Sequence, residues 1–421
     1  MFYLNNFKIG CFGLLLSCLT ALNCFSQKEL RTEDWIYEPQ IKTVQFYLND
    51  KQMSFPAISL KAKQDYLTLS FDEMGTELSD FTVEIANCTQ NWEVSMLLSL
   101  EFYQGLPTSS ILQRALSRMT RVPYIHYTFL LENQFLMSGN YLLKVYRNGD
   151  PSDLVITRRF IVYEQSVIVQ AQAINTQDVA QRQKMQHVAF ELYPGGLSII
   201  NPYQDIQVTV LQNFRWNTSK SKLNPTFIAP DKIEYRFDAQ TDFWGGNEFR
   251  KCDIRTFRLK SMTVEAIEDK GNFYQIWQYP DKPRQFNPYF TAKDWNGDYQ
   301  VFTTDADNAT IEADYVNTVF RLQSEKYSTP VYIFGKFSDW NLLPQNKLVW
   351  TGNQYQIDIP LKQGIYDYQY AILENNIPNE TLIEGSHFET ENYYTVLVYY
   401  RQPTDRSDKL ISYKNINYYD R

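Results

Sequence analysis

Histidine and cysteine, which supply many of the metal ligands and nucleophiles of enzymes, are scarce in this chain. Its 421 residues include five Cys and three His, namely His126, His187 and His387. No His has a second His or a Cys at a spacing that binds zinc. The chain also lacks a Gly-x-Ser-x-Gly elbow, a phosphate-binding loop and a dinucleotide-binding fingerprint. We therefore expect no catalytic residues, no cofactor and no metal site.

Glycine, proline and runs of basic charge are also limited. There are 16 Gly and 17 Pro, too few for a low-complexity chain, and no repeat of fixed period is present. The formal net charge is −8 and no long basic run occurs, so nucleic acid is not an expected partner. Beyond residue 26, no segment approaches the roughly 20 apolar residues of a membrane-spanning helix.

Aromatic residues are abundant, with 31 Tyr, 27 Phe and 8 Trp. Tyr and Phe favour the pleated, half-buried surfaces of sheets, so this composition indicates an all-β protein. A chain of 421 residues is too long for one hydrophobic core, which predicts two to four domains.

Residues 1–26 are predicted to be a signal peptide. Lys8 provides the positive charge, residues 9–22 the apolar stretch, and small residues precede Gln27. A lipoprotein signal ending at Cys18 or Cys24 is the alternative, but the first leaves the apolar stretch too short and the second has Asn before the cysteine. We expect an exported, soluble chain after cleavage.

Two cysteines, Cys88 and Cys252, remain outside the predicted signal peptide. They could pair in an oxidising compartment. Because they fall in different predicted domains, two buried free thiols are the favoured interpretation.

Alternating apolar and polar residues predict three β domains, at residues 27–165, 166–300 and 301–421. The clearest hairpin is 141–164, with Asn148 and Gly149 in its turn. Strands spaced by turn residues in this way are typical of immunoglobulin-like sandwiches, so we expect tandem β-sandwiches. One short amphipathic helix is predicted in the first domain, over Ser109–Arg118, because its apolar residues recur at helical spacing.

Two segments resemble metal or catalytic sites in part. Asp294–Asp298 has oxygen donors at alternate positions, as at the start of a calcium loop, but its sixth position is Tyr299 rather than Gly. A turn at Asn296-Gly297 is the favoured interpretation. His387 lies among glutamates, which we interpret as a polar strand edge. The sequence alone identifies no carboxylate pair of the kind that a glycosidase requires.

Four aromatic residues near the C-terminus could stack on sugar rings: Trp340, Trp350, Tyr355 and Tyr368. The alternative is that they fill a sandwich core or support its turns. The first interpretation would make the chain an exported glycan-binding protein that uses its C-terminal sandwich.

Residues 331–341 (VYIFGKFSDWN) and 361–374 (LKQGIYDYQYAILE) resemble the early-set immunoglobulin-like modules of glycogen-active enzymes. A longer resemblance runs through an ordered set of motifs along the chain. The set includes FPAISL (55–60), LTLSFDEM (67–74), SGNYLLKVY (138–146), LQNFRWN (211–217), GGNEFRKCDIR (245–255), DWNGDY (294–299) and EGSHFETENYYTVLVYYR (384–401). This set is similar to the plug protein family of the Bacteroidota type IX secretion system, formerly a domain of unknown function.

The plug-family resemblance implies a non-enzymatic, periplasmic, β-rich protein. Such a plug binds and seals the periplasmic opening of the outer-membrane translocon barrel of the SprA or Sov type, and contacts the membrane only through that barrel. The resemblance supplies no catalytic, cofactor-binding or metal-binding residues and no contact residues. The chain has Cys252 where the family tends to have an aromatic residue, which also argues against a structural disulfide.

Overall fold

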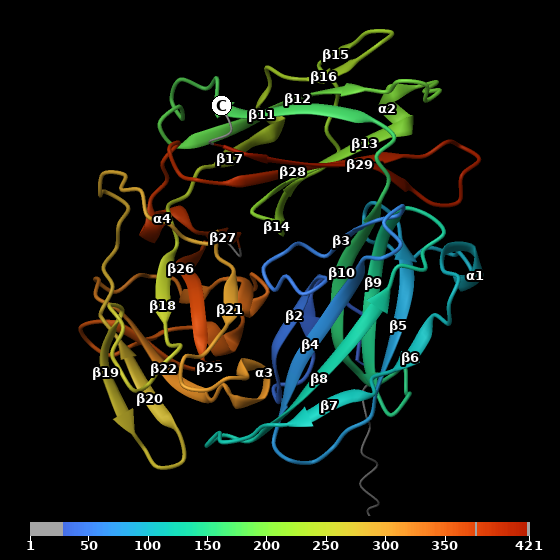
Figure 1. Cartoon of the computed structure of the whole chain (residues 1–421). Helices are drawn as coiled ribbons and strands as arrows, with labels where there is room; N and C mark the ends of the chain where they lie inside the picture. Colours follow the sequence, from blue (N-terminus) through green and yellow to red (C-terminus); the bar gives the residue numbers. More distant parts are fainter. Residues whose placement is uncertain (1–27, 375–376, 419–421) are drawn as a thin grey trace, which may run out of the picture.

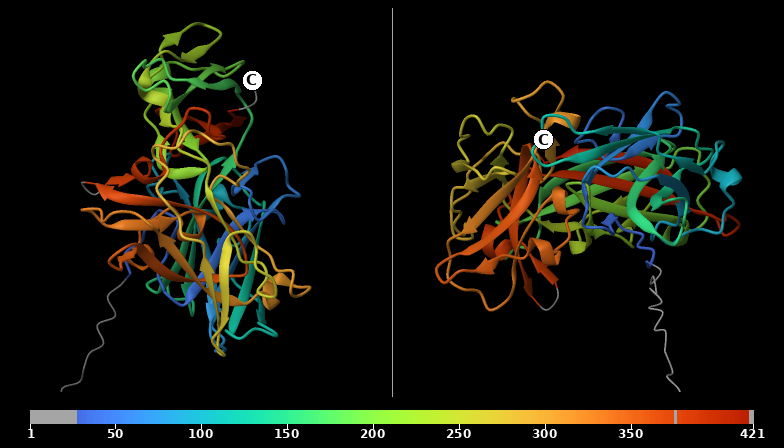
Figure 2. Two further views of the ribbon diagram at one scale, coloured as in Figure 1. Left: turned by 90° about the vertical axis from the view of Figure 1, so that its left-hand side faces the viewer. Right: turned by 90° about the horizontal axis from the view of Figure 1, so that it is seen from below.

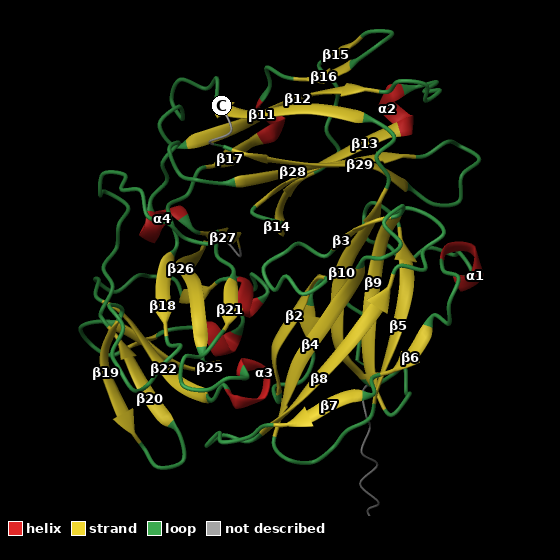
Figure 3. Cartoon of the chain, viewed as in Figure 1, coloured by secondary structure: helices red, strands yellow, loops and turns green. Residues whose placement is uncertain are grey.

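The computed structural model describes residues 28–374 and 377–418. The predicted signal peptide lies outside the described residues. The described chain is almost entirely β, as the sequence predicted, and its strands form six sheets that pack as three sandwiches (Figure 3). Its four α-helices have one turn each: α1 (Ser99–Phe102), α2 (Pro202–Asp205), α3 (Ala309–Glu312) and α4 (Thr381–Glu384).

The first sandwich is built from strands that follow one another between residues 35 and 163. Its six-stranded sheet has the order β1-β10-β9-β5-β6, with β3 beside β10. These strands are β1 (Trp35–Ile36), β3 (Ala57–Ser59), β5 (Phe81–Cys88), β6 (Thr108–Ser110), β9 (Gly139–Arg147) and β10 (Leu154–Tyr163). The facing sheet has the order β2-β4-β8-β7, with β2 (Ile41–Leu48), β4 (Tyr66–Met74), β7 (Gln113–Leu116) and β8 (Tyr124–Glu132).

Local sequence explains much of this sandwich. Asn148 and Gly149 both have positive φ, at 52° and 70°, and they join β9 to β10 as the hairpin prediction required. Apolar side chains from both sheets form one core. The predicted helix at Ser109–Arg118 is wrong: this segment forms β6 and β7, the edge strands of the two sheets. The hydrogen bonds that this segment forms at the sheet edges stabilise it more than its weak helical propensity would stabilise a helix.

The second sandwich combines distant parts of the chain. One sheet has the order β11-β12-β16-β15, with β17 also beside β12, and the other has the order β14-β13-β28-β29. The strands are β11 (Ile168–Asn175), β12 (Met185–Tyr193), β13 (Ile206–Gln212), β14 (Arg215–Lys220), β15 (Phe227–Ile228), β16 (Ile233–Tyr235), β17 (Asp242–Trp244), β28 (Tyr393–Tyr400) and β29 (Lys409–Asn417).

The third sandwich is inserted between β17 and β28. Its sheets are β18-β26-β21, with β23 and β27 also beside β26, and β19-β20-β22-β25-β24. The strands are β18 (Arg250–Asp253), β19 (Val264–Asp269), β20 (Tyr274–Gln278), β21 (Tyr299–Val301), β22 (Tyr315–Leu322), β23 (Val331–Phe334), β24 (Val349–Trp350), β25 (Tyr355–Lys362), β26 (Gly364–Glu374) and β27 (Ile377–Asn379).

Strand pairing therefore crosses the domain boundary expected at residue 300. β13 pairs with β28 along its whole length, from Ile206 with Tyr400 to Gln212 with Tyr394. The ranges 166–300 and 301–421 do not form separate sandwiches, because the last two strands return to complete the second one. Alternation reveals where strands occur but not which distant strands pair, which is why the sequence did not show the insertion.

The three sandwiches lie against one another. The second lies above the first and the third, which are side by side (Figure 1). The view from below also shows the first and third sandwiches next to each other (Figure 2). Each sandwich thus has a side that faces a neighbour and a side that faces solvent.

Candidate functional site

No group of three or more His, Cys, Asp or Glu able to hold a metal ion occurs among the described residues. Two histidines have carboxylate partners: His126 Nδ1 lies 2.6 Å from Asp72 Oδ1, and His187 Nδ1 lies 2.8 Å from Asp242 Oδ1. The backbone N–H of His387 donates to the Gly246 carbonyl. Over the same residues, no helix has the length and apolar character needed to cross a membrane.

The segment from Asp294 to Asp298 forms a turn. Asn296 and Gly297 have φ values of 53° and 82°, and Asp294 Oδ1 accepts a 2.9 Å hydrogen bond from the Asn296 N–H. The other oxygen of Asp294 accepts from the backbone of Phe249. The segment thus forms the turn that Asn296-Gly297 predicted, and the Asp294 carboxylate holds it.

A buried charged network joins the first and third sandwiches. Asp72 on β4 is fully buried, and its Oδ2 lies 2.7 Å from Lys362 Nζ at the end of β25. The Tyr315 hydroxyl donates to the same oxygen at 2.7 Å, and His126 contacts the other. Burial would raise the pKa of Asp72, but Lys362 and His126 outweigh this effect and hold the pKa below its usual range.

Further polar contacts surround this network. Asp314 accepts hydrogen bonds from the backbone N–H groups of Arg121 and Val122, at 2.8 and 3.1 Å. Elsewhere at this junction, Arg158 and Asp339 form a buried ion pair at 3.0 Å. Directional contacts of this kind admit few relative positions of the two sandwiches.

The first and second sandwiches share an apolar cluster of their own. It includes Trp92 and Ile161 from the first sandwich and Leu397 and Tyr399 from the second. The Tyr399 hydroxyl also donates to Asn140 Oδ1 at 2.8 Å. This interface thus combines apolar burial with a satisfied buried hydroxyl.

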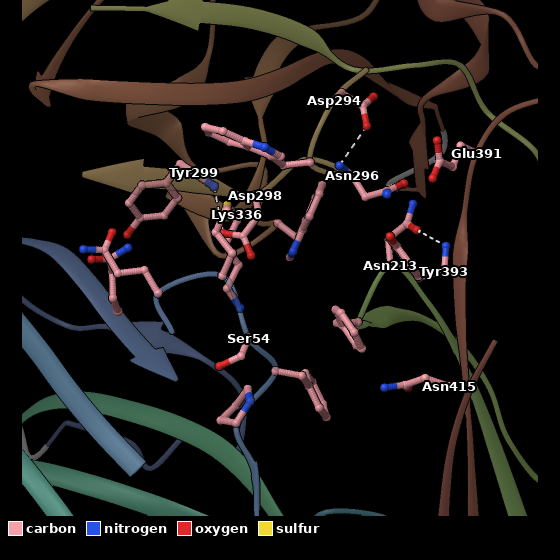
Figure 4. A pocket seen from close by; sticks show the side chains of 18 of the residues that line it. Ser54, Asn213, Asp294, Asn296, Asp298, Tyr299, Lys336, Glu391, Tyr393 and Asn415 are labelled. Atoms are coloured by element: carbon pink, nitrogen blue, oxygen red, sulfur yellow. Dashed lines mark hydrogen bonds between the residues drawn. The ribbon is translucent and has the colours of Figure 1, made fainter. Parts of the chain in front are cut away.

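A cavity of about 700 Å³ lies where the three sandwiches meet (Figure 4). Its volume falls in the range of small-molecule pockets. Its polar wall includes Asn213, whose Oδ1 accepts a 2.9 Å hydrogen bond from the Tyr393 N–H. Aromatic side chains from all three sandwiches form much of the rest: Phe55, Phe214, Trp295, Tyr299, Trp340 and Tyr393.

Two of these aromatic residues have left-handed backbone conformations. Phe214 and Trp340 have φ values of 57° and 60°, which are uncommon for bulky residues. The Phe214 ring stacks on Phe55 with centroids 5.0 Å apart, and the Trp340 ring lies 4.3 Å from the Arg215 guanidinium. The strained turns therefore direct large rings into the junction.

Several carboxyl groups near the cavity have raised pKa values. Burial raises the pKa of Glu248 to about 7 and that of Asp298 to about 6. Burial, assisted by the charge of Asp294, raises the pKa of Asp367 to about 7. The charge of this region consequently changes near neutral pH.

The four aromatic residues considered for sugar stacking do not form one exposed platform. Tyr355 and Tyr368 are buried in the core of the third sandwich, and Trp340 is 8% exposed. Trp350 is half-buried, with its ring edge-on to Tyr355 at 4.9 Å. Their packing matches the alternative interpretation, in which they fill the fold.

Both cysteines of the described chain are free and buried. Cys88 lies in the first sandwich and Cys252 in the third. Burial raises the pKa of the Cys88 thiol to about 12, which suppresses the reactive thiolate. The prediction of two buried free thiols is confirmed.

An exposed apolar strip on the first sandwich was not predicted from the sequence. Its five members lie in α1 or close to α1 and β6 in sequence, and they expose between 70% and 94% of their surface: Met96, Leu98, Leu100, Leu106 and Leu112. Apolar residues at alternate positions were a signal for this strip, but alternation does not tell which face of a segment is buried.

The fold and its junctions define a three-sandwich β protein whose domains are held together by buried polar contacts. Residues 41–164 match the family model described as the type 9 secretion system plug protein 1st domain. This match supports the type IX secretion plug family that the sequence resemblance predicted. The early-set immunoglobulin-like character of the C-terminal part remains a prediction.

Among solved structures, one of those similar to this chain matches it over most of its length. A hypothetical protein from Parabacteroides merdae ATCC 43184 is 27% identical, with a TM-score of 0.88 over 92% of this chain and 100% of that one. The C-terminal domain of the Streptococcus pyogenes antigen I/II-family protein AspA covers 88% of this chain and 98% of its own, but its identity is 6% and its TM-score 0.18. None of the curated proteins matches the chain.

Proposed function

We propose that this protein is a non-enzymatic periplasmic plug of the type IX secretion system. In this role it binds the periplasmic opening of the SprA- or Sov-type translocon barrel and seals it when no cargo passes. The observation that carries the proposal is the plug-family match over residues 41–164. The predicted signal peptide supports export to the periplasm, where the barrel opening is accessible.

The domain junctions suit a sealing role. A seal must keep its shape while solute and cargo press on it, so its domains must not slide over one another. The ion pairs of Asp72 with Lys362 and of Arg158 with Asp339 oppose sliding, because displacement would leave buried charges unpaired. Three sandwiches also provide a broad surface, and a stable contact with the barrel requires at least about 1,000 Å² of buried area.

The packing of the C-terminal aromatic residues argues against a glycan-binding role. It depended on Trp340, Trp350, Tyr355 and Tyr368 as an exposed platform, and three of these side chains are buried.

Deletion of the gene in a producing cell tests the proposal. We expect the outer membrane to become more permeable to large antibiotics, because the unoccupied barrel would remain open. The full-length gene should restore the barrier, whereas a version without residues 1–26 should not, because its product would stay outside the periplasm. Unchanged permeability, together with failure of the protein to co-purify with the barrel, would overturn the proposal.

A further inference from the structure

The exposed apolar strip has an inverted pattern of burial. Between Val94 and Leu100, the serines at positions 95 and 99 are half-buried beside Leu97, which packs against the first core, whereas Met96, Leu98 and Leu100 are exposed. Folding alone would favour the opposite arrangement, because burial of a Leu or Met side chain is worth about 1.5–3 kcal/mol relative to exposure.

The strip is not a loose loop, because buried residues anchor it along its length. Trp92 packs in the cluster between the first two sandwiches, and Phe102, Tyr103 and Ile111 pack in the first core. The backbone is tied as well: the Ile111 N–H donates to the Phe81 carbonyl at 2.9 Å. The exposed side chains are therefore held in place before any partner arrives, which lowers the entropy cost of binding.

Charge is almost absent from this segment. From Val94 to Leu112 the only charged residue is Glu101, and it forms an ion pair with Arg406 at 2.6 Å. Depletion of charge is characteristic of the centre of protein interfaces. A membrane-binding segment would instead carry basic residues for anionic headgroups, and this stretch has none.

The size of the strip also fits a protein interface. At about 25 cal/mol per Å², the transfer energy of one buried Leu or Met corresponds to roughly 60–120 Å². Five such side chains supply roughly 300–600 Å², compared with about 800 Å² for one partner of a standard interface. The strip could form the apolar centre of such an interface, with polar neighbours as its rim.

The strip lies on the side of the first sandwich that is opposite to the third. Figure 1 shows α1 and β6 along that outer side, and the view from below in Figure 2 agrees. β6 is also the last strand of its sheet, so the sheet ends at the strip.

We infer that the strip formed by Met96, Leu98, Leu100, Leu106 and Leu112 is the docking surface through which this protein binds an apolar, charge-poor protein surface. The identity of that partner rests on the proposed function, which makes it the translocon barrel.

Site-specific crosslinking in cells tests the inference. The photo-reactive residue p-benzoylphenylalanine replaces Leu98 in the full-length chain, and in a control it replaces Leu259, which is equally exposed on the third sandwich. We expect an adduct with the barrel polypeptide, identified by mass spectrometry, from position 98 and not from position 259. An adduct between two copies of the chain from position 98, or barrel adducts from both positions in equal yield, would overturn the inference.

Retention on the barrel provides a second measurement. The triple variant Met96→Ser, Leu98→Ser, Leu100→Ser should bind the purified, detergent-solubilised barrel at least about tenfold more weakly than the unmodified chain. The control variant Val179→Ser, Leu259→Ser, Met262→Ser removes three equally exposed apolar residues elsewhere and should bind normally.

These outcomes separate the two proposals. If the unmodified chain does not bind the barrel, the proposed function fails. If the unmodified chain binds and the strip variant binds equally well, only the docking surface is wrong. Strip-dependent flotation with anionic phospholipid vesicles would show a membrane contact and would also overturn the inference.

Discussion

The two sides of the first sandwich use their side chains in opposite ways. The side that faces the third sandwich buries the charged residue Asp72 against Lys362 of that sandwich, whereas the opposite side exposes Leu98 and Leu100. Ordinary folding places charge outside and apolar groups inside. We interpret the first side as a fixed junction between domains and the second as the proposed binding surface for a partner.

A buried ion pair is weak evidence for stability, since an apolar pair of similar volume is often equally stable. What the pair supplies is a single allowed geometry, because any other position leaves a charge unpaired. We interpret the Asp72 network as a device that fixes the domain arrangement. The apolar strip, by contrast, tolerates small differences in how a partner fits, and the flexible Met96 side chain adds to that tolerance.

The largest expected effect comes from breaking the junction. Lys362→Met leaves Asp72 buried without its main counter-charge, so the free energy of unfolding should fall by about 3–5 kcal/mol. Urea unfolding followed by tryptophan fluorescence measures the change. If Asp72→Asn is added, the uncompensated charge is gone and much of the loss should be recovered. A Lys362→Met variant as stable as the unmodified protein would show that the pair does not hold the junction.

A buried carboxyl that forms no ion pair provides a second comparison with Asp72. Asp367 on β26 is fully buried, forms no ion pair among the described residues, and has a pKa raised to about 7. Between about pH 4 and 7 the unfolded chain has lost this proton but the folded chain retains it. The contribution of Asp367 to the free energy of unfolding therefore falls as the pH rises through this range.

Replacement of Asp367 by Asn isolates this contribution. The Asn side chain retains an acceptor for the backbone N–H of Trp295 but cannot ionise. We expect the unmodified protein to lose on the order of 2–4 kcal/mol relative to Asp367→Asn between pH 4 and pH 7. Unfolding curves measured at several pH values give the difference. Parallel pH profiles for the two proteins would show that Asp367 titrates normally.

Local signals predicted local structure well. Alternation revealed strands such as β5 and β10, Asn148-Gly149 predicted a hairpin, and Asn296-Gly297 predicted a turn. In these cases the residues that determine the structure lie within a few positions of one another. The resemblance to the plug family, which the match over residues 41–164 supports, could also be recognised from motifs along the chain.

Features that depend on distant residues were not predictable. The pairing of β13 with β28 joins strands on either side of the entire third sandwich. The contact of Asp72 with Lys362 depends on how two sandwiches dock, and neither residue is unusual in sequence. The pattern at Ser109–Arg118 predicted a helix, although the backbone of this segment pairs with the edges of the two sheets.

The smallest expected effect is at the exposed strip, where two adjacent residues provide a matched pair. Ile111 is 4% exposed and lies in the first core, whereas Leu112 is 84% exposed. Ile111→Ala should lower the free energy of unfolding by about 2–5 kcal/mol. Leu112→Ala should change it by no more than about 0.5 kcal/mol in either direction, because truncation of an exposed side chain removes few contacts within the fold.

Unfolding of both variants, measured under the same conditions, shows whether the strip serves the fold or a partner. A small change for Leu112→Ala, combined with weaker binding to the barrel, would mean that this side chain is retained for the contact and not for folding. A loss as large as that of Ile111→Ala would instead place Leu112 in the core. Leu112 would then not belong to the exposed apolar side of the first sandwich.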